Sequence, residues 1–349
     1  MINEIEIKNF RAFEHTRIKG FGAVNLIGGE NNVGKTALLE ALLLLFQPKP
    51  EVILSFYKYR KEAEHLLEKA PENLWDYLFY LRNKKEKASI AIPDFLSLNS
   101  IINYQYNAVY LEDDLFLNSI HIRINTESRE ITISAIEIEE DKNGKNTIKD
   151  WNTDFILPYI TTSYRMSNDN LVHLYTEVLK LKKLKSVINI LQKIDATIAN
   201  LTLDGTGGRV VLGVLREDEE MIPLGMFGDA VRKATEILFL ALTTNSKAIF
   251  IDEIENGIHY TKQADVWKAL FTIAKEREIQ IFATTHSKEM IEAFARVGSE
   301  SENEGQGVYF NMFRSPRSGQ IVASPYNMEL LTDLLLHKEL IRGEGVEKI

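Results

Sequence analysis

The sequence predicts an α/β fold with a mostly parallel central sheet, together with an antiparallel β-subdomain and a helical insertion. A short apolar run at residues 23–27 leads into a glycine-rich loop and then a helical segment. Two further apolar runs, residues 248–251 and 279–285, are separated by a helical pattern, which is typical of parallel strands buried on both faces. Alternating runs near residues 119–134 indicate antiparallel strands.

In chain order, apolar alternation predicts strands at residues 2–10 and 24–27. A helix is expected from Gly34 to Phe46, with Pro48 and Pro50 stopping it. Residues 51–100 have a charged, helical pattern.

The middle of the chain changes character. Period-two alternation predicts strands at residues 119–124 and 131–134, and Asp-Lys-Asn-Gly at residues 141–144 predicts a turn. Residues 168–200 read as helical. We therefore expect residues 51–199 to be an insertion into a domain formed by residues 1–50 and 200–349.

The last part of the chain contains the most strongly apolar strands. Residues 248–251 and 279–285 should be strands, joined by a helix over residues 260–275. A leucine stripe at residues 327–342 indicates a closing helix that packs on the core rather than docking a partner.

Composition narrows the possible functions of this 349-residue chain. Hydrophobic residues make up 45% and charged residues 26%, which is normal for a folded protein, and no cysteine is present. Disulfides, thiolate metal sites and cysteine nucleophiles are thereby excluded. The net charge of −9 argues against a broadly basic surface for binding nucleic acid. For the lysines of residues 180–185, two interpretations stay open: contact with DNA, or the solvated face of an amphipathic helix. Without a secretory signal or a membrane-length apolar run, we expect a cytoplasmic protein with no membrane partner.

The loop after the first parallel strand has the spacing of a P-loop. Gly29 is followed by four residues and then Gly34, Lys35 and Thr36, between an expected strand and an expected helix. Main-chain N–H groups of such a loop point at phosphate oxygens, and the helix N-terminus favours negative charge. Lys35 should reach the β and γ phosphates, and Thr36 should offer its hydroxyl to Mg²⁺. ATP and Mg²⁺ are the expected cofactors, although the loop alone does not select adenine over guanine.

Three polar side chains follow the other two parallel strands. Asp252 and Glu253 end one strand and His286 ends the next. Because carboxyl ends of parallel strands meet at one sheet edge, these residues should converge on the P-loop. We expect Asp252 to hold Mg²⁺ with Thr36, Glu253 to polarise the attacking water, and His286 to lie near the γ-phosphate.

The order of these motifs resembles that of the ABC-type ATPases, which include the SMC, RecF and OLD (overcoming lysogenization defect) families. The stretches GENNVGKTALLEAL, IDEIENGIHY and ATTHSKEMIEAF are most similar to the OLD-like ATPases, over residues 1–46 and about 220–295. The resemblance implies a homodimer or higher homo-oligomer in which each P-loop faces a signature segment of the other subunit. Residues 223–232 occupy the place of that segment, but Met226 stands where a serine is expected and Ala230 where a second glycine is common.

The residues expected to act on the nucleotide form two sets. Lys35, Glu253 and His286 are the expected catalytic residues. The expected nucleotide contacts are Gly29, Asn31, Asn32, Gly34, Lys35, Thr36, Ala37, Gly228 and Asp229, and the metal ligands are Thr36 and Asp252.

The resemblance also bears on partners. OLD-like nucleases carry a Toprim domain after the histidine strand, and the residues after His286 contain no recognisable two-metal acidic site. We therefore expect an ATPase that controls a separate effector, a nuclease or toxin, in bacterial anti-phage defence. A RecF- or SMC-like DNA-repair ATPase is the main alternative, and a transporter ATPase subunit and a small-molecule kinase fit less well.

Overall fold

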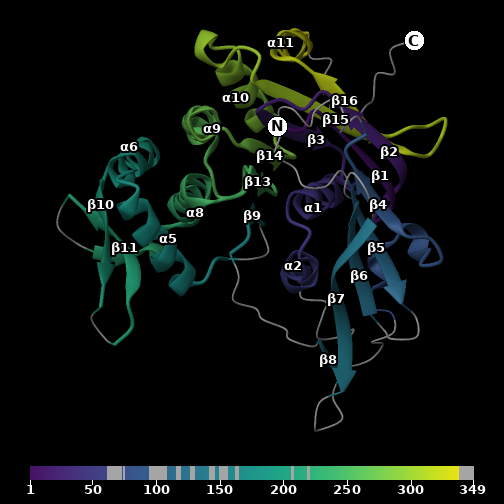
Figure 1. Cartoon of the computed structure of the whole chain (residues 1–349). Helices are drawn as coiled ribbons and strands as arrows, with labels where there is room; N and C mark the ends of the chain where they lie inside the picture. Colours follow the sequence, from purple (N-terminus) through teal and green to yellow (C-terminus); the bar gives the residue numbers. More distant parts are fainter. Residues whose placement is uncertain are drawn as a thin grey trace.

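The computed structural model describes residues 1–60, 73, 75–93, 108–114, 119–125, 130–140, 146–148, 156–161, 165–205, 208–217 and 221–337. Two sheets dominate these residues, one mainly parallel and one antiparallel. Figure 1 shows α1 between the two sheets, with α8 and α9 on the opposite side of the parallel sheet. The predicted α/β fold with a parallel and an antiparallel sheet is confirmed.

The mainly parallel sheet carries the ends of all three motif strands. Its order is β16-β15-β3-β14-β13-β9, and every neighbouring pair is parallel except β15 with β16. In this order the strands are Ile321–Tyr326, Gly307–Arg314, Val24–Gly29, Gln280–Thr284, Ala248–Ile251 and Tyr159–Ile160. The three predicted parallel strands, β3, β13 and β14, are therefore adjacent.

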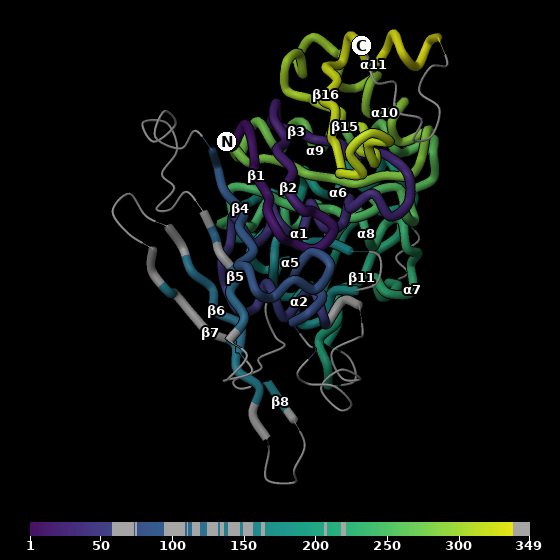
Figure 2. The backbone as a smooth tube through the Cα atoms, turned by 90° about the vertical axis from the view of Figure 1, so that its right-hand side faces the viewer, coloured from purple at the N-terminus to yellow at the C-terminus, as the bar shows by residue number. Residues whose placement is uncertain are grey.

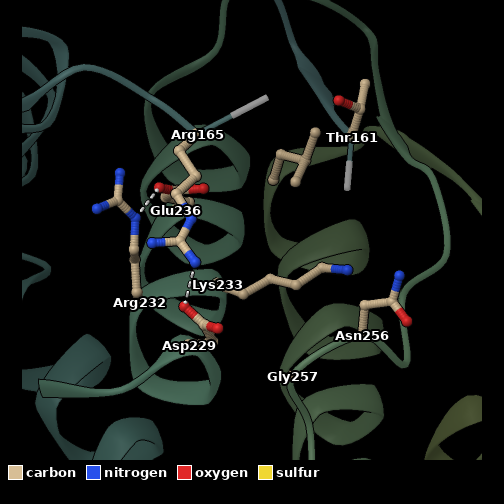
Figure 3. A pocket seen from close by; sticks show the side chains of 9 residues that line it. Thr161, Arg165, Asp229, Arg232, Lys233, Glu236, Asn256 and Gly257 are labelled. Atoms are coloured by element: carbon tan, nitrogen blue, oxygen red, sulfur yellow. Dashed lines mark hydrogen bonds and ion pairs between the residues drawn. The ribbon is translucent and has the colours of Figure 1, made fainter. Parts of the chain in front are cut away.

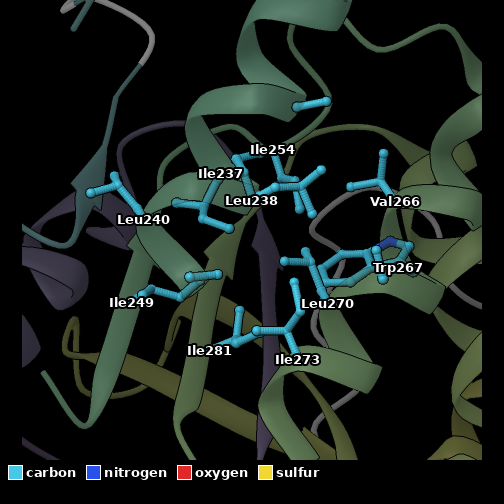
Figure 4. Packing of buried hydrophobic residues seen from close by; sticks show 14 of the residues in the cluster. Ile237, Leu238, Leu240, Ile249, Ile254, Val266, Trp267, Leu270, Ile273 and Ile281 are labelled. Carbon is cyan, nitrogen blue, oxygen red and sulfur yellow. The ribbon is translucent and has the colours of Figure 1, made fainter. Parts of the chain in front are cut away.

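Both faces of this sheet are buried. On β13, Phe250 packs into the core shared with α1, whereas Ile249 and Ile251 pack into the core on the other side. Figure 4 shows the second core, where Ile249 and Ile281 meet apolar side chains of α8 and α9 such as Leu270. Continuous apolar character in β13 and β14 follows from this double burial.

The antiparallel sheet has the order β2-β1-β4-β5-β6-β7-β8. In this order the strands are Phe13–Lys19, Glu4–Phe10, Ala88–Ala91, Ala108–Asp114, Ser119–Asn125, Glu130–Glu140 and Asn146–Ile148. Figure 2 shows them side by side along one face of the molecule. The predicted strands at residues 119–124 and 131–134 belong to β6 and β7, whereas the predicted turn at residues 141–144 lies outside the described residues.

The helices around the parallel sheet complete the two cores. α1 spans Lys35–Phe46, as predicted, and α2 spans Pro50–Arg60, so Pro50 begins a helix in a position that suits proline. The other helices are α5 Asn168–Lys180, α6 Leu184–Ile194, α7 Leu224–Phe227, α8 Asp229–Thr243, α9 Gln263–Arg277, α10 Lys288–Gly298 and α11 Met328–Leu336. Short 3₁₀ turns lie at Asp76–Leu78, Tyr80–Arg82, Tyr260–Lys262 and Ser301–Asn303.

Two sequence-based element assignments are wrong in part. Residues 88–91, expected to be helical, form β4, because they pair on both sides with β1 and β5. The helix expected over residues 168–200 is broken between α5 and α6, where Lys182 has a φ of 56°. It then gives way to β10 (Ile198–Asp204), which pairs with β11 (Val211–Arg216), and β11 pairs with β12 (Met221–Pro223).

The division into an ATPase domain and an insertion stays a prediction, but two strands inside residues 51–199 are joined to elements outside them. β4 extends the sheet begun by β1 and β2, and β9 is an edge strand of the parallel sheet. Among the residues that the structure describes, no helix is long and apolar enough to cross a membrane.

Candidate nucleotide site

The P-loop, the paired acids and His286 meet at one edge of the parallel sheet. β3 and β13 flank β14, with Ile27 opposite Thr284 and Ile251 opposite Ala283. The three loops that follow these strands therefore start side by side. The predicted convergence of residues from three separate sequence regions is what the structure shows.

Two glycines give the P-loop its path. Gly29 has a φ of 132°, and a Cβ there would lie 2.1 Å from the main-chain oxygen of Met312. Gly34 has a φ of 86° and precedes the first residue of α1. Both conformations favour glycine, and the second lets the loop enter the helix so that the first N–H groups of α1 face the loop.

Lys35 lies under the loop, with its Nζ donating to the carbonyl oxygens of Gly29 at 2.8 Å and Glu30 at 2.5 Å. Burial lowers the pKa of Lys35 to about 8, although Asp252, Glu253 and nearby acids oppose this shift. The two groups that accept hydrogen bonds from Lys35 are thus neutral carbonyls, which do not balance its positive charge. Phosphate oxygens are stronger acceptors for such a group than carbonyl oxygens.

A hydroxyl and a carboxylate lie together at the predicted metal position. The Thr36 hydroxyl donates to Asp252 at 3.1 Å, and the Thr284 hydroxyl donates to the other carboxylate oxygen at 2.6 Å. Burial raises the pKa of Asp252, and these hydroxyls oppose the shift. The described residues contain no cluster of three or more His, Cys, Asp or Glu that could hold a metal. One carboxylate and one hydroxyl still suit Mg²⁺, which keeps waters and takes phosphate oxygens as further ligands.

The carboxylate of Glu253 has neighbours other than this pair. Its carboxylate accepts a hydrogen bond from Asn256 Nδ2 at 2.6 Å, and its other oxygen lies 3.7 Å from His286 Nε2. Its main chain has a φ of 48°, in the left-handed region. Asp252 and Glu253 therefore serve different neighbours, which fits the separate roles expected for a metal ligand and a base.

Three residues around these acids were missed by sequence reasoning. Thr284 contacts Asp252 and also accepts from the main-chain N–H of Glu253 at 2.8 Å. Glu255 accepts from the His286 main-chain N–H at 2.7 Å, and Asn256 contacts Glu253. Thr284 had a usable signal, because it precedes His286 by two residues and so lies on the same side of an extended chain.

The expected nucleotide contacts divide into two groups. Asn31 and Asn32 are exposed in the P-loop, and Ala37 lies in the first turn of α1. Gly228 and Asp229 lie at the start of α8, where Asp229 adjoins Gly257 of the loop after β13. The first group belongs to the P-loop and its helix, and contact of the second group with a nucleotide stays a prediction.

The segment before α8 is open to solvent. Met226 has 81% of its surface exposed, and Asp229 pairs with the exposed Arg165 at 2.8 Å. A cleft of about 160 Å³ adjoins it, bounded by the chain near Thr161, by α8 and by the loop after β13. Figure 3 shows Lys233 crossing this cleft from α8 toward Asn256.

Fold and site together define the class of this protein as an α/β P-loop ATPase with an SMC/ABC-type head fold. The chain is similar to the Smc head domain with an extended coiled coil bound to the C-terminal domain of ScpA, derived from Pyrococcus furiosus, with a TM-score of 0.53 and 11% identity over 97% of this chain and 99% of the other. A model of the AAA ATPase domain matches residues 1–291. The chain belongs to this AAA ATPase domain family.

Two sequence relatives add detail. An "ATP/GTP phosphatase" of Helicobacter pylori is 26% identical over 344 residues, which cover 86% of this chain and 90% of the relative. A "DNA replication and repair protein RecF" of Bacillus mycoides is 46% identical over 48 residues, which cover 14% of this chain and 13% of the relative. The first similarity spans nearly the whole chain, and the second is local.

Affinity for ATP is expected to fall as the pH rises above about 8, because burial sets the pKa of Lys35 in the free protein near that value. Bound phosphates favour the charged lysine and raise this pKa, so binding above it requires proton uptake. The affinity should be fully present below pH 8 and should then drop by at most about tenfold per pH unit. Titration calorimetry in buffers of different ionisation enthalpy measures both the ATP affinity and the number of protons taken up on binding.

The Lys35→Arg variant is the control for this pH effect. Its guanidinium stays protonated throughout the range, so its ATP affinity should not follow the same curve. An affinity of the native protein that stays constant from about pH 7 to pH 9.5 would contradict the assignment.

Proposed function

We propose that this chain is an OLD-like ATPase whose copies pair around ATP and whose ATP cycle controls a separate effector, a nuclease or toxin, in bacterial defence against phage. The observation that carries the proposal is the solvent exposure of the segment at Met226 and Gly228, at the start of α8. In a head-to-tail pair, each such segment would close the nucleotide site of the other subunit. Main-chain N–H groups at the start of α8 are suited to receive a γ-phosphate.

Within each site, the proposed roles follow the contacts described above. Mg²⁺ held by Thr36 and Asp252 would neutralise charge on the phosphates. Lys35 would exchange its carbonyl partners for phosphate oxygens. Glu253, oriented by Asn256 and facing His286, would accept a proton from the attacking water. Hydrolysis of ATP or GTP is also what the name of the Helicobacter pylori relative states for that protein.

A DNA-repair ATPase is the second candidate, favoured by the local similarity to RecF. The lysines of residues 180–185 offer a surface for it, since Lys182 and Lys185 are exposed beside the end of α5. Two other lysines of this cluster are paired with acids, Lys180 with Glu177 and Lys183 with Glu276. The partial neutralisation of the cluster, together with the net charge of −9, makes this candidate the weaker one.

Affinity purification of tagged Glu253→Gln protein from its own cells, with ATP and Mg²⁺, distinguishes the two candidates. Lys35→Ala protein, purified in parallel, controls for contacts that do not need the nucleotide. We expect a protein partner in stoichiometric amount with the first variant only, identified by mass spectrometry and tested for nuclease or toxic activity. Bound DNA without a protein partner would contradict the effector proposal and support the repair ATPase.

A further inference from the structure

Lys233 has an unusual environment for a lysine. It lies on the first turns of α8 and reaches across the cleft, where its Nζ donates to the main-chain oxygen of Glu253 at 2.5 Å. Figure 3 shows its side chain extended between α8 and the loop that carries Asn256. The acceptor is a carbonyl rather than a carboxylate, although Asp252, Glu253, Glu255 and Glu236 all act on its charge. Burial of an ammonium group that donates to a carbonyl is costly even with acids nearby, which indicates a role for Lys233 beyond ion pairing.

The atom that Lys233 contacts belongs to a residue with a left-handed backbone, Glu253. Glu253 has a φ of 48°, a conformation that is unfavourable for a residue with a side chain. Its N–H donates to the Thr284 hydroxyl at 2.8 Å, and its carbonyl accepts from Asn256 N at 3.1 Å as well as from Lys233. Such a conformation persists only when its surroundings fix it from several sides.

We propose that Lys233 is a positioning residue for hydrolysis, which fixes the main-chain carbonyl of Glu253 and thereby keeps the Glu253 carboxylate facing His286. The proposal rests on the role of Glu253 given above. Thr284 fixes one side of the Glu253 backbone from β14, and Lys233 fixes the other from α8. Without the ammonium group, the Glu253 carbonyl keeps only its contact with Asn256 N, and the carboxylate is held by Asn256 Nδ2 without a fixed main chain behind it.

Three variants separate this role from simple filling of the cleft. Lys233→Met keeps most of the aliphatic stem but removes the donor, Lys233→Arg keeps charge and donors, and Lys275→Met is the matched control at an exposed lysine of α9. We expect Lys233→Met to lower kcat for ATP about 10- to 100-fold with little change in KM, because misplacement of a catalytic group affects the chemical step. Lys233→Arg should recover part of the loss, and Lys275→Met should match the native protein.

A double variant tests whether Lys233 acts through Glu253. Since Glu253→Gln already removes the base, adding Lys233→Met should slow hydrolysis no further. Three results would each overturn the proposal. They are effects of the two substitutions that multiply in the double variant, a kcat for Lys233→Met within about twofold of the native value, and a rise in KM with unchanged kcat.

Hydrogen exchange gives a readout that does not depend on hydrolysis. Amides of residues 252–258 should exchange faster in Lys233→Met than in the native protein or in Lys275→Met, before any nucleotide is added. Unchanged exchange in this segment would overturn the proposal. A native protein that hydrolyses no ATP would instead refute the roles assigned to the nucleotide site, and the exchange result would still decide whether Lys233 fixes the loop.

Discussion

Replacing Glu253 by glutamine is expected to slow ATP hydrolysis by about 100- to 10,000-fold while ATP affinity stays close to the native value. Glutamine has nearly the same shape and still accepts a hydrogen bond from Asn256, but it does not accept a proton from water. Asp252 and Thr36, which contact each other and not the Glu253 carboxylate, should still support nucleotide binding. Phosphate release at saturating ATP and binding of a fluorescent ATP analogue measure the two quantities separately.

Glu14→Gln, at an exposed position of β2, is the matched control for this substitution. It should have native rates and native affinity. If Glu253→Gln hydrolysed ATP at more than about a tenth of the native rate, Glu253 would not be the base, since removal of a general base costs more than that.

Replacing Lys35 by alanine is expected to weaken ATP binding about 100-fold, equivalent to roughly 2.8 kcal/mol. The substitution removes the charge that the phosphates would contact, and it leaves the carbonyls of Gly29 and Glu30 without the donor that now joins them. Equilibrium binding of a fluorescent ATP analogue measures this loss. Circular dichroism should show that the variant still folds, because the apolar side chains of α1 pack into the core between the two sheets (Figure 1).

Unchanged ATP affinity in the Lys35→Ala variant would be incompatible with a nucleotide held by this loop. The Lys275→Ala variant serves as the control, since Lys275 is exposed on α9.

The central strands and the P-loop were predictable because their local sequence and their environment agree. β13 and β14 are apolar throughout, and burial on both faces requires that pattern. α1 follows a glycine-rich loop and ends before two prolines. Since parallel strand ends share an edge, the meeting of Asp252 and His286 with the P-loop followed from the order of the strands alone.

Other features depend on contacts between distant parts of the chain. β4 is a four-residue strand directly after a charged segment, and its conformation is set by pairing with β1 and β5. The break between α5 and α6 occurs within a sequence that keeps its helical spacing. β15 and β16 were not foreseen, although β15 is a direct neighbour of β3. Propensity is a weak guide wherever such tertiary pairing decides the outcome.

The same limit applies inside the site. The residue types of Asp252 and Glu253 indicated their chemistry, but not which neighbour each carboxylate contacts. That depends on the left-handed backbone at Glu253 and on donors from β14 and α8, including Lys233. No sequence spacing connects Lys233 with Glu253, because the two lie on different elements brought together only by the fold.

Mixing two inactive variants tests the central claim, a site shared between two copies, most directly. Lys35→Ala has a defective P-loop and an intact exposed segment, whereas Met226→Glu has an intact P-loop and a charge at the proposed contact with the partner. Each alone should hydrolyse little ATP, and Met226→Glu should still bind it. In a head-to-tail pair, one of the two sites of a mixed dimer combines the intact parts, so mixing should restore hydrolysis. A mixture as inactive as its components, or full activity of Met226→Glu alone, would contradict the account.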